Sequence, residues 1–268
     1  MLSSLLIIAS GVSGAVVSTD HLRSQLVAET TEVVAGQPLR LGLLFEHDPH
    51  WHTYWANPGD SGLPTRLSWK LPDGVEAGAV QWPMPSRFDL GDIVNYGYEG
   101  RTLLPIVLQV PADFDHSSLS IELEARWLIC QEECIPGKAQ YALQLPLARQ
   151  AQTDPRWQED FRRAERAQPQ STAWTATLNR DGEQLTLRLS GALPSAVAAA
   201  EWYPLTPRLV ANSAVPEWQA SADGGELRWR LSEFFSGLPP HSEWWLRVGD
   251  EYYRLQAHAA GAPAVSGQ

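Results

Sequence analysis

Apolar and polar residues alternate with a period of two along most of the chain, which is typical of strands with one buried face. In the first half, this pattern marks the segments LRLGLLF (39–45), TRLSW (65–69), LLPIVLQV (103–110), LSIELEARW (119–127) and AQYALQLPL (139–147). In the second half, it marks TAWTATL (172–178), QLTLRLS (184–190), ELRWRLS (226–232), EWWLRVG (243–249) and EYYRLQA (251–257). Turn-forming stretches rich in Pro, Gly and Asp separate the strands of the first half: NPGDSG (57–62), LPDG (71–74), WPMP (82–85) and PADFD (111–115). Short strands divided by such turns predict antiparallel sandwiches.

One segment, TDPRWQEDFRRAERAQPQ (153–170), departs from the strand pattern. Asp154 can cap a helix, Pro155 suits a first turn and Pro169 can end the helix. We therefore expect a short helix that links two β units.

The expected fold class is all-β, with two tandem immunoglobulin-like antiparallel β-sandwiches joined by a short helical linker. The expected divisions are a signal-like segment at 1–18, sandwiches at 19–148 and 171–259, the linker at 149–170 and a disordered tail at 260–268.

The start of the chain, MLSSLLIIASGVSGA, is a short apolar run that ends in small residues, as secretory signals do, although no Lys or Arg precedes it. It is shorter than the ~18–20 apolar residues of a membrane span, and no later segment reaches that length. We therefore expect a soluble mature chain with no membrane span, in a compartment where a disulfide can persist. The net charge of -11 argues against a nucleic-acid partner, which requires a basic surface.

The segment RWLICQEECIPGK (126–138) holds both cysteines of the chain. A purely structural bridge is one possibility, although closing so short a loop restricts the unfolded chain little. Metal binding is a second possibility, since two thiolates suit Cu(I), whereas zinc wants four ligands. Redox exchange is the third, because cysteines at this spacing can bridge across a tight hairpin or one helical turn, and short rings are more readily reduced. Redox exchange fits best, but the spacing alone does not decide.

Three motifs occur in a fixed order around this pair: HWHTYWANPGDSGLPT (50–65), WPMPSRFDLGDIVNYGYEG (82–100) and ARWLICQEECIPG (125–137). As an ordered set they resemble the periplasmic amino-terminal domain of DsbD-type thiol:disulfide interchange proteins, especially the ScsB-like branch. The later segment AEWYPLTPRLV (200–210) is similar to the second β-sandwich of ScsB-like ectodomains.

The resemblance implies a protein thiol–disulfide oxidoreductase without a bound cofactor or metal. Its partners would be periplasmic thioredoxin-fold proteins, and a DsbD-type transmembrane reductase domain, in the same or a separate chain, would supply electrons. Cys130 and Cys134 are then the redox pair, with Cys134 the nucleophile and Cys130 the resolving thiol.

The resemblance also implies a cap loop that folds an aromatic side chain over the cysteines. VNYGYEG (94–100) occupies that place, so Tyr96 and Tyr98 are the expected shield and Gly97 allows the loop to bend.

Four further residues are considered for the site. Tyr54 and Trp55 are expected to line the same pocket, and Trp127 is expected to pack beneath the pair. His52 could assist proton transfer, but we expect a surface or hydrogen-bonded histidine.

Two alternatives use the same two sulfurs. The chain could be a periplasmic Cu(I)-binding or copper-tolerance protein, or a structural interaction module with an inert disulfide.

Overall fold

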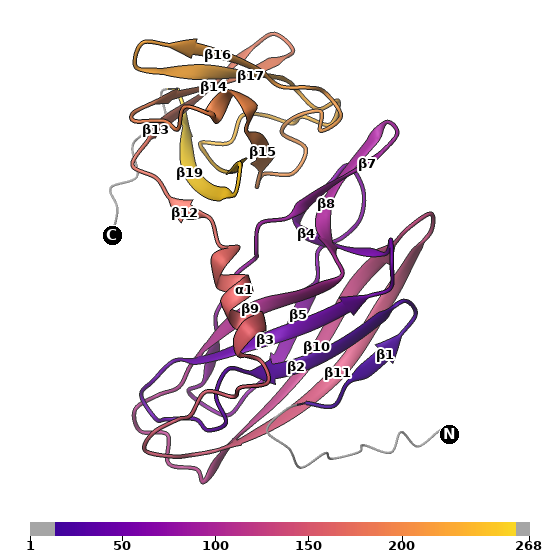
Figure 1. Ribbon diagram of the computed structural model, residues 1–268, viewed down its shortest axis with the longest axis vertical. Coiled ribbons are helices and arrows are strands. Elements are labelled where there is room, and N and C mark those ends of the chain that lie inside the picture. Colours follow the sequence, from indigo (N-terminus) through magenta and orange to yellow (C-terminus); the bar gives the residue numbers. More distant parts are fainter. Residues whose placement is uncertain (1–13, 261–268) are drawn as a thin grey trace. The chain divides into compact units, whose positions relative to one another are not determined.

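The computed structural model describes residues 14–260, so residues 1–13 of the expected signal-like segment and 261–268 of the expected tail lie outside it. The described chain is mostly antiparallel β-structure, and its α-helix is α1 (Gln158–Arg166) (Figure 1). Within residues 14–260, no helix is both long and apolar enough to cross a bilayer.

The chain divides into two compact units that interleave along the sequence. Unit 1 contains residues up to Trp55, Leu63–Pro83 and Tyr98–Arg166. Unit 2 contains Ala56–Gly62, Met84–Gly97 and the residues from Ala167 onward.

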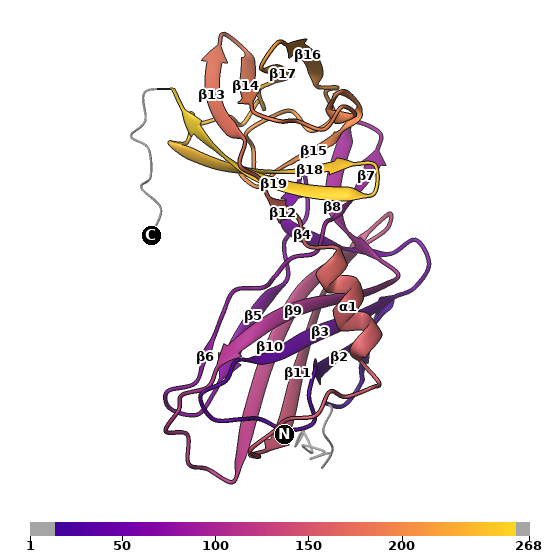
Figure 2. The same cartoon turned by 60° about the vertical axis from the view of Figure 1, so that its left-hand side comes forward.

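One sheet of unit 1 is antiparallel throughout and carries the helix on one face. Its strands, in spatial order, are β1 (Val17–Thr19), β2 (Leu22–Ala28), β3 (Leu39–His47), β9 (Arg101–Gln109) and β6 (Glu76–Ala77). The helix lies along this sheet in both views (Figures 1 and 2), and Phe161 and Ala164 pack on Val27, Leu44 and Leu103. This burial fixes α1 to unit 1, because an aromatic side chain removed from water stabilises the contact.

The second sheet contains the long hairpin that carries both cysteines. Its strand order is β11 (Cys134–Pro146), β10 (Ser118–Cys130), β4 (His52–Gly59), β8 (Ile93–Glu99) and β7 (Ser86–Leu90), and β5 (Arg66–Lys70) also pairs with β10. β4 passes from unit 1 to unit 2 after Trp55, and β8 passes back after Gly97.

Most of unit 2 is one sheet in the order β15-β18-β19-β13-β14-β17-β16, and β12 pairs with β19. Its elements are β12 (Gln170–Ser171), β13 (Thr175–Asp181), β14 (Gln184–Ser190), the 3-10 turn η1 (Val197–Ala199), β15 (Glu201–Pro204), β16 (Glu217–Ser221), β17 (Gly224–Arg230), β18 (His241–Val248) and β19 (Glu251–Ala259). Leu178, Leu187 and Trp244 lie in its fully buried core.

Each segment expected to be a strand forms one, with its ends shifted by a few residues. Two findings correct the expectations. The pairings of β12 and β13 with β19 are parallel rather than antiparallel. The helix begins at Gln158 rather than directly after Asp154. In the turn between them, the Arg156 backbone N–H donates to the Asp154 carboxylate at 3.0 Å.

Candidate redox site

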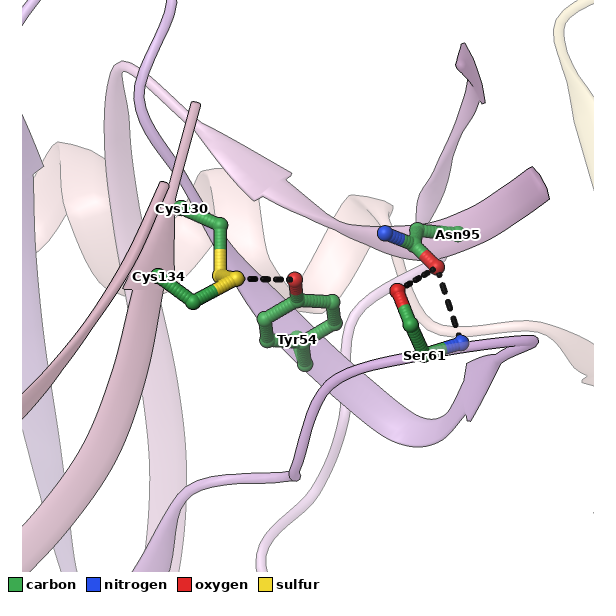
Figure 3. The surroundings of a disulfide bond; sticks show 5 residues. All are labelled: Tyr54, Ser61, Asn95, Cys130 and Cys134. Atoms are coloured by element: carbon green, nitrogen blue, oxygen red, sulfur yellow. Dashed lines mark hydrogen bonds between the residues drawn. A yellow bond between two sulfur atoms is a disulfide. The ribbon is translucent and has the colours of Figure 1, made fainter. Parts of the chain in front are cut away.

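The two cysteines close the end of the β10–β11 hairpin. The strands pair without interruption from Ser118 opposite Pro146 to Cys130 opposite Cys134. Directly opposite residues of an antiparallel pair place their side chains on the same face. The register therefore brings the two sulfurs together, with Cα atoms 4.2 Å apart and a disulfide between them (Figure 3).

The turn between the cysteines is Gln131-Glu132-Glu133, in which the Gln131 N–H donates to the Glu133 carbonyl at 3.1 Å. Cys130 is 2% exposed, whereas Cys134 lies on the surface. An incoming thiol can reach Cys134 far more readily than Cys130.

Tyr54, on β4, is the aromatic residue that contacts this pair. Its hydroxyl lies 3.7 Å from Cys134 Sγ (Figure 3), while the side chain as a whole is buried. A hydroxyl here can donate a hydrogen bond to a thiolate and favour the charged form. The structure therefore brings Tyr54 to the exposed sulfur.

His52 lies opposite the other sulfur. It is the residue of β4 that pairs with Cys130 of β10, and it is 3% exposed. Its ring meets that of Tyr54 edge to face, with centroids 5.2 Å apart. Burial lowers the pKa of His52. His52 is buried rather than on the surface, because β4 lies between β10 and β8 inside the sheet. The alternative expectation, a hydrogen-bonded histidine, stays a prediction.

A second histidine, His47 on β3, lies near this region. Its Nδ1 lies 2.7 Å from the Gly100 carbonyl oxygen and its Nε2 lies 2.9 Å from Thr53 Oγ1. Burial lowers the pKa of His47 to about 4. The neutral imidazole therefore donates from Nδ1 to the carbonyl and accepts the Thr53 hydroxyl at Nε2. Only the pairing of β3 with β9, which is not visible in the sequence, places Gly100 within its reach.

Trp55 and Trp127 are buried. Successive side chains of a strand point to opposite faces, so Trp55 faces away from Tyr54, and Trp127, three residues before Cys130, faces away from that cysteine. Trp127 lies over Gly137, where a Cβ atom would come within 2.1 Å of its Nε1. The Trp127 ring also meets Phe45 edge to face at 5.3 Å. Trp127 thus supports the hairpin from the opposite face of the sheet.

The expected cap segment is a strand, β8, rather than a loop. In unit 1, the Tyr98 hydroxyl donates to the Pro83 carbonyl at 2.8 Å, and its ring stacks parallel to Trp82. Burial raises the pKa of Tyr98 well above its usual value. The shielding role of Tyr96, Gly97 and Tyr98 stays a prediction.

In unit 2, the Tyr96 hydroxyl donates to Asn212 Oδ1 at 3.2 Å, and its ring meets Tyr203 edge to face at 5.2 Å. Burial raises the pKa of Tyr96.

Glu124, on β10, forms ion pairs on the cysteine hairpin that the sequence did not predict. Its carboxylate lies 2.6 Å from Lys138 Nζ and 2.8 Å from the Arg126 guanidinium. Hydrogen bonds from Lys138 and then Arg126 lower the pKa of Glu124 to about 2. Glu124 therefore engages both cations. Across residues 14–260, no group of three or more His, Cys, Asp or Glu side chains is placed to hold a metal ion.

Comparison with known proteins identifies the region around this site. Residues 23–146 match the family model described as "Thiol:disulfide interchange protein DsbD, N-terminal". A comparison with curated protein sequences finds no significant match.

Among solved structures, the crystal structure of the N-terminal periplasmic domain of ScsB from Proteus mirabilis shares the fold. It matches with a TM-score of 0.66 at 20% sequence identity, over 93% of this chain and 98% of that chain. Domains 5–6 of the S-layer protein SbsC match with a TM-score of 0.23 at 7% identity, over 92% and 98% of the two chains. A likeness that low carries no argument about this chain.

The cysteine hairpin lies inside the matched region. Residues 23–146 of this chain therefore belong to the family of DsbD amino-terminal domains.

Proposed function

We propose that this protein is a thiol–disulfide interchange module that relays electrons to thioredoxin-fold partner proteins through Cys130 and Cys134. One observation carries the proposal. The pair is asymmetric, with Cys134 on the surface and Cys130 buried. Exchange proceeds by attack of one thiolate on a disulfide sulfur through a mixed disulfide, so one sulfur of the pair must be open to another protein. A bridge that only stabilised the hairpin would not need this exposure.

The asymmetry supports a different role for each sulfur. In the reduced protein, the Cys134 thiolate attacks a partner disulfide, a new S–S bond joins the proteins, and the partner's other sulfur leaves as a thiolate. Cys130 then attacks Cys134 Sγ, the internal disulfide forms, and the partner's second sulfur leaves. The partner gains two electrons and this protein loses two. A DsbD-type transmembrane reductase domain, in the same or a separate chain, returns them.

Three further parts of the proposal follow from the family and the fold. Both β units are immunoglobulin-like sandwiches, which give the hairpin a rigid support. The protein works in the periplasm, where its partners carry disulfides. Tyr96 and Tyr98 shield the pair until a partner docks, and Gly97 allows the shield to move. The fold shared with the ScsB domain and the family of residues 23–146 support these proposals.

Trapping tests the proposed function. A Cys130→Ala variant cannot complete the second step, so it should accumulate a mixed disulfide with an oxidised thioredoxin-fold protein through Cys134. Non-reducing electrophoresis and mass spectrometry of the linked peptides measure this adduct. The matched Cys134→Ala variant should form none. An adduct with Cys134→Ala alone would reverse the two roles, and no adduct with either variant contradicts the proposal.

A further inference from the structure

His52 and Cys130 form one cross-strand pair. They are directly opposite each other where β4 meets β10, so their side chains share a face of the sheet. They are 3% and 2% exposed, respectively. Tyr54, two residues further along β4, points to the same face and reaches the other sulfur. Strand β4 thus places the Tyr54 hydroxyl at Cys134 and the His52 imidazole on the same face as Cys130.

The buried sulfur has a chemical problem that the exposed one does not. Only a thiolate attacks a disulfide, and burial in apolar surroundings disfavours the thiolate. Cys134 can lose its proton to water. Cys130 is enclosed, so its proton needs an acceptor that is also inside the protein.

We infer that His52 accepts the proton of the Cys130 thiol in the step that resolves the mixed disulfide. The inference rests on the proposed function and adds a general base to it. As Cys130 Sγ attacks Cys134 Sγ, the thiol proton passes to the imidazole. The bond from Cys134 to the partner breaks, and the partner's sulfur leaves with the electron pair. The imidazolium then returns its proton to the departing thiolate or to water. No further oxidant or reductant enters this step.

The surroundings of His52 suit a base. An imidazole must be neutral to accept a proton, and burial lowers the pKa of His52. The titratable groups facing it are Cys130 from β10, Tyr54 from its own strand and His47 from β3. His47 is also neutral near pH 7, because burial lowers its pKa to about 4. Tyr54 and His47 carry no negative charge that would hold His52 protonated.

A small disulfide separates the two steps without a protein partner. Reduced protein is mixed with dithionitrobenzoate, an aromatic disulfide that releases a coloured thiolate on each exchange. Attack by Cys134 releases the first equivalent, and attack by Cys130 on the mixed disulfide releases the second. A Cys130→Ser variant, which releases only the first, identifies the phases.

The His52→Gln variant should keep the first phase and slow the second roughly 10- to 100-fold at neutral pH. Its second phase should then rise with pH as hydroxide replaces the lost base. The matched control is His47→Gln, which removes a buried histidine that does not pair with Cys130. It should keep both phases. His52→Asn provides a second variant if Gln disturbs the fold, and an unchanged first phase shows that the hairpin is intact.

Two different outcomes would overturn the inference, and they separate a failure of the proposed function from a failure of the role of His52 alone. A wild-type protein that never releases the second equivalent contradicts both the role of His52 and the proposed function. A wild-type protein that releases both, with His52 variants that match its second phase and its pH profile, contradicts the role of His52 alone.

Discussion

Tyr54 gives the exposed sulfur a hydrogen-bond donor. When the disulfide is reduced, its hydroxyl, 3.7 Å from Cys134 Sγ in the oxidised form, can donate to the Cys134 thiolate. A hydrogen bond to a charged group contributes about 1.5–3 kcal/mol, so Tyr54→Phe should raise the pKa of Cys134 by roughly one to two units. Ultraviolet titration of the thiolate in a Cys130→Ser background measures this pKa. An unchanged or lower value would show that the hydroxyl does not stabilise the thiolate.

His47 makes the stability of unit 1 depend on pH. The unfolded chain takes up a proton at His47 near the ordinary value of 6.5, whereas burial lowers the folded pKa to about 4. Between these values the unfolded state binds more protons than the folded state. The contribution of neutral His47 to the free energy of unfolding is therefore fully present above pH 6.5 and is lost as pH falls from 6.5 towards 4. In His47→Gln this loss of stability, on the order of 3 kcal/mol, should be absent.

Urea unfolding at a series of pH values tests the His47 prediction. The control is His116→Gln, a substitution at an exposed histidine, which should keep the wild-type dependence. If the free energy of unfolding depends on pH equally in the wild type and in His47→Gln, the pH dependence does not come from His47.

Individual residues of the site differed in how well the sequence revealed them. The cysteines and Tyr54 lie within short motifs, so local sequence was sufficient. The position of His52 could not be predicted, because it depends on which residue of β4 pairs with Cys130 of β10. No local pattern encodes that register. Glu124 was missed for a similar reason, since Lys138 reaches it from the neighbouring strand.

At the scale of elements, one buried side chain holds the β7–β8 hairpin within unit 2. Asn212 Nδ2 donates to Asp60 Oδ1 at 2.7 Å, and Asn212 Oδ1 accepts the Tyr96 hydroxyl at 3.2 Å. The Asn212 carbonyl also accepts Arg87 Nη1 at 3.1 Å. Asn212 therefore joins both strands of the hairpin and the 57–62 segment to the rest of unit 2.

Asn212→Ala should loosen that hairpin. It removes the hydrogen bond that the buried Tyr96 hydroxyl donates to Asn212, at a cost of about 0.5–1.5 kcal/mol. Amide hydrogen exchange of residues 86–97 should accelerate, while the β10–β11 hairpin keeps its protection. Ser213→Ala, at the exposed neighbouring position, is the control and should change neither. Unchanged exchange at residues 86–97 in Asn212→Ala would show that the hairpin is held in another way.

Sequence patterns found the strands with regular alternation and missed others, among them β4 and β8. Both contain residues that normally end strands, Pro58 and Gly59 in β4 and Gly97 in β8. Gly59 is needed inside the sheet, because it has a φ of +88° and a Cβ atom there would come within 2.2 Å of the Val94 carbonyl oxygen. A glycine that permits close backbone approach has the same sequence signature as a turn.

At the scale of the whole chain, the interleaving of the units was not predictable. The sequence suggested divisions at 19–148 and 171–259, whereas the compact units exchange residues 56–62 and 84–97. In unit 2, Asn57 Nδ2 donates to the Pro204 carbonyl at 2.7 Å, and Arg247 Nη2 donates to the Pro85 carbonyl at 3.1 Å. These bonds join residues far apart in sequence through backbone carbonyls, which any residue can supply.

The central claim is that the bond between Cys130 and Cys134 opens and closes under conditions that a partner protein can provide. Equilibration of the folded protein in glutathione and dithiothreitol buffers, followed by counting of free thiols, tests it most directly. The account predicts a reversible transition at a potential above about −300 mV, in the range of exchange-active pairs. A pair that stays oxidised at potentials below about −300 mV would behave as a locked structural bond and contradict the account.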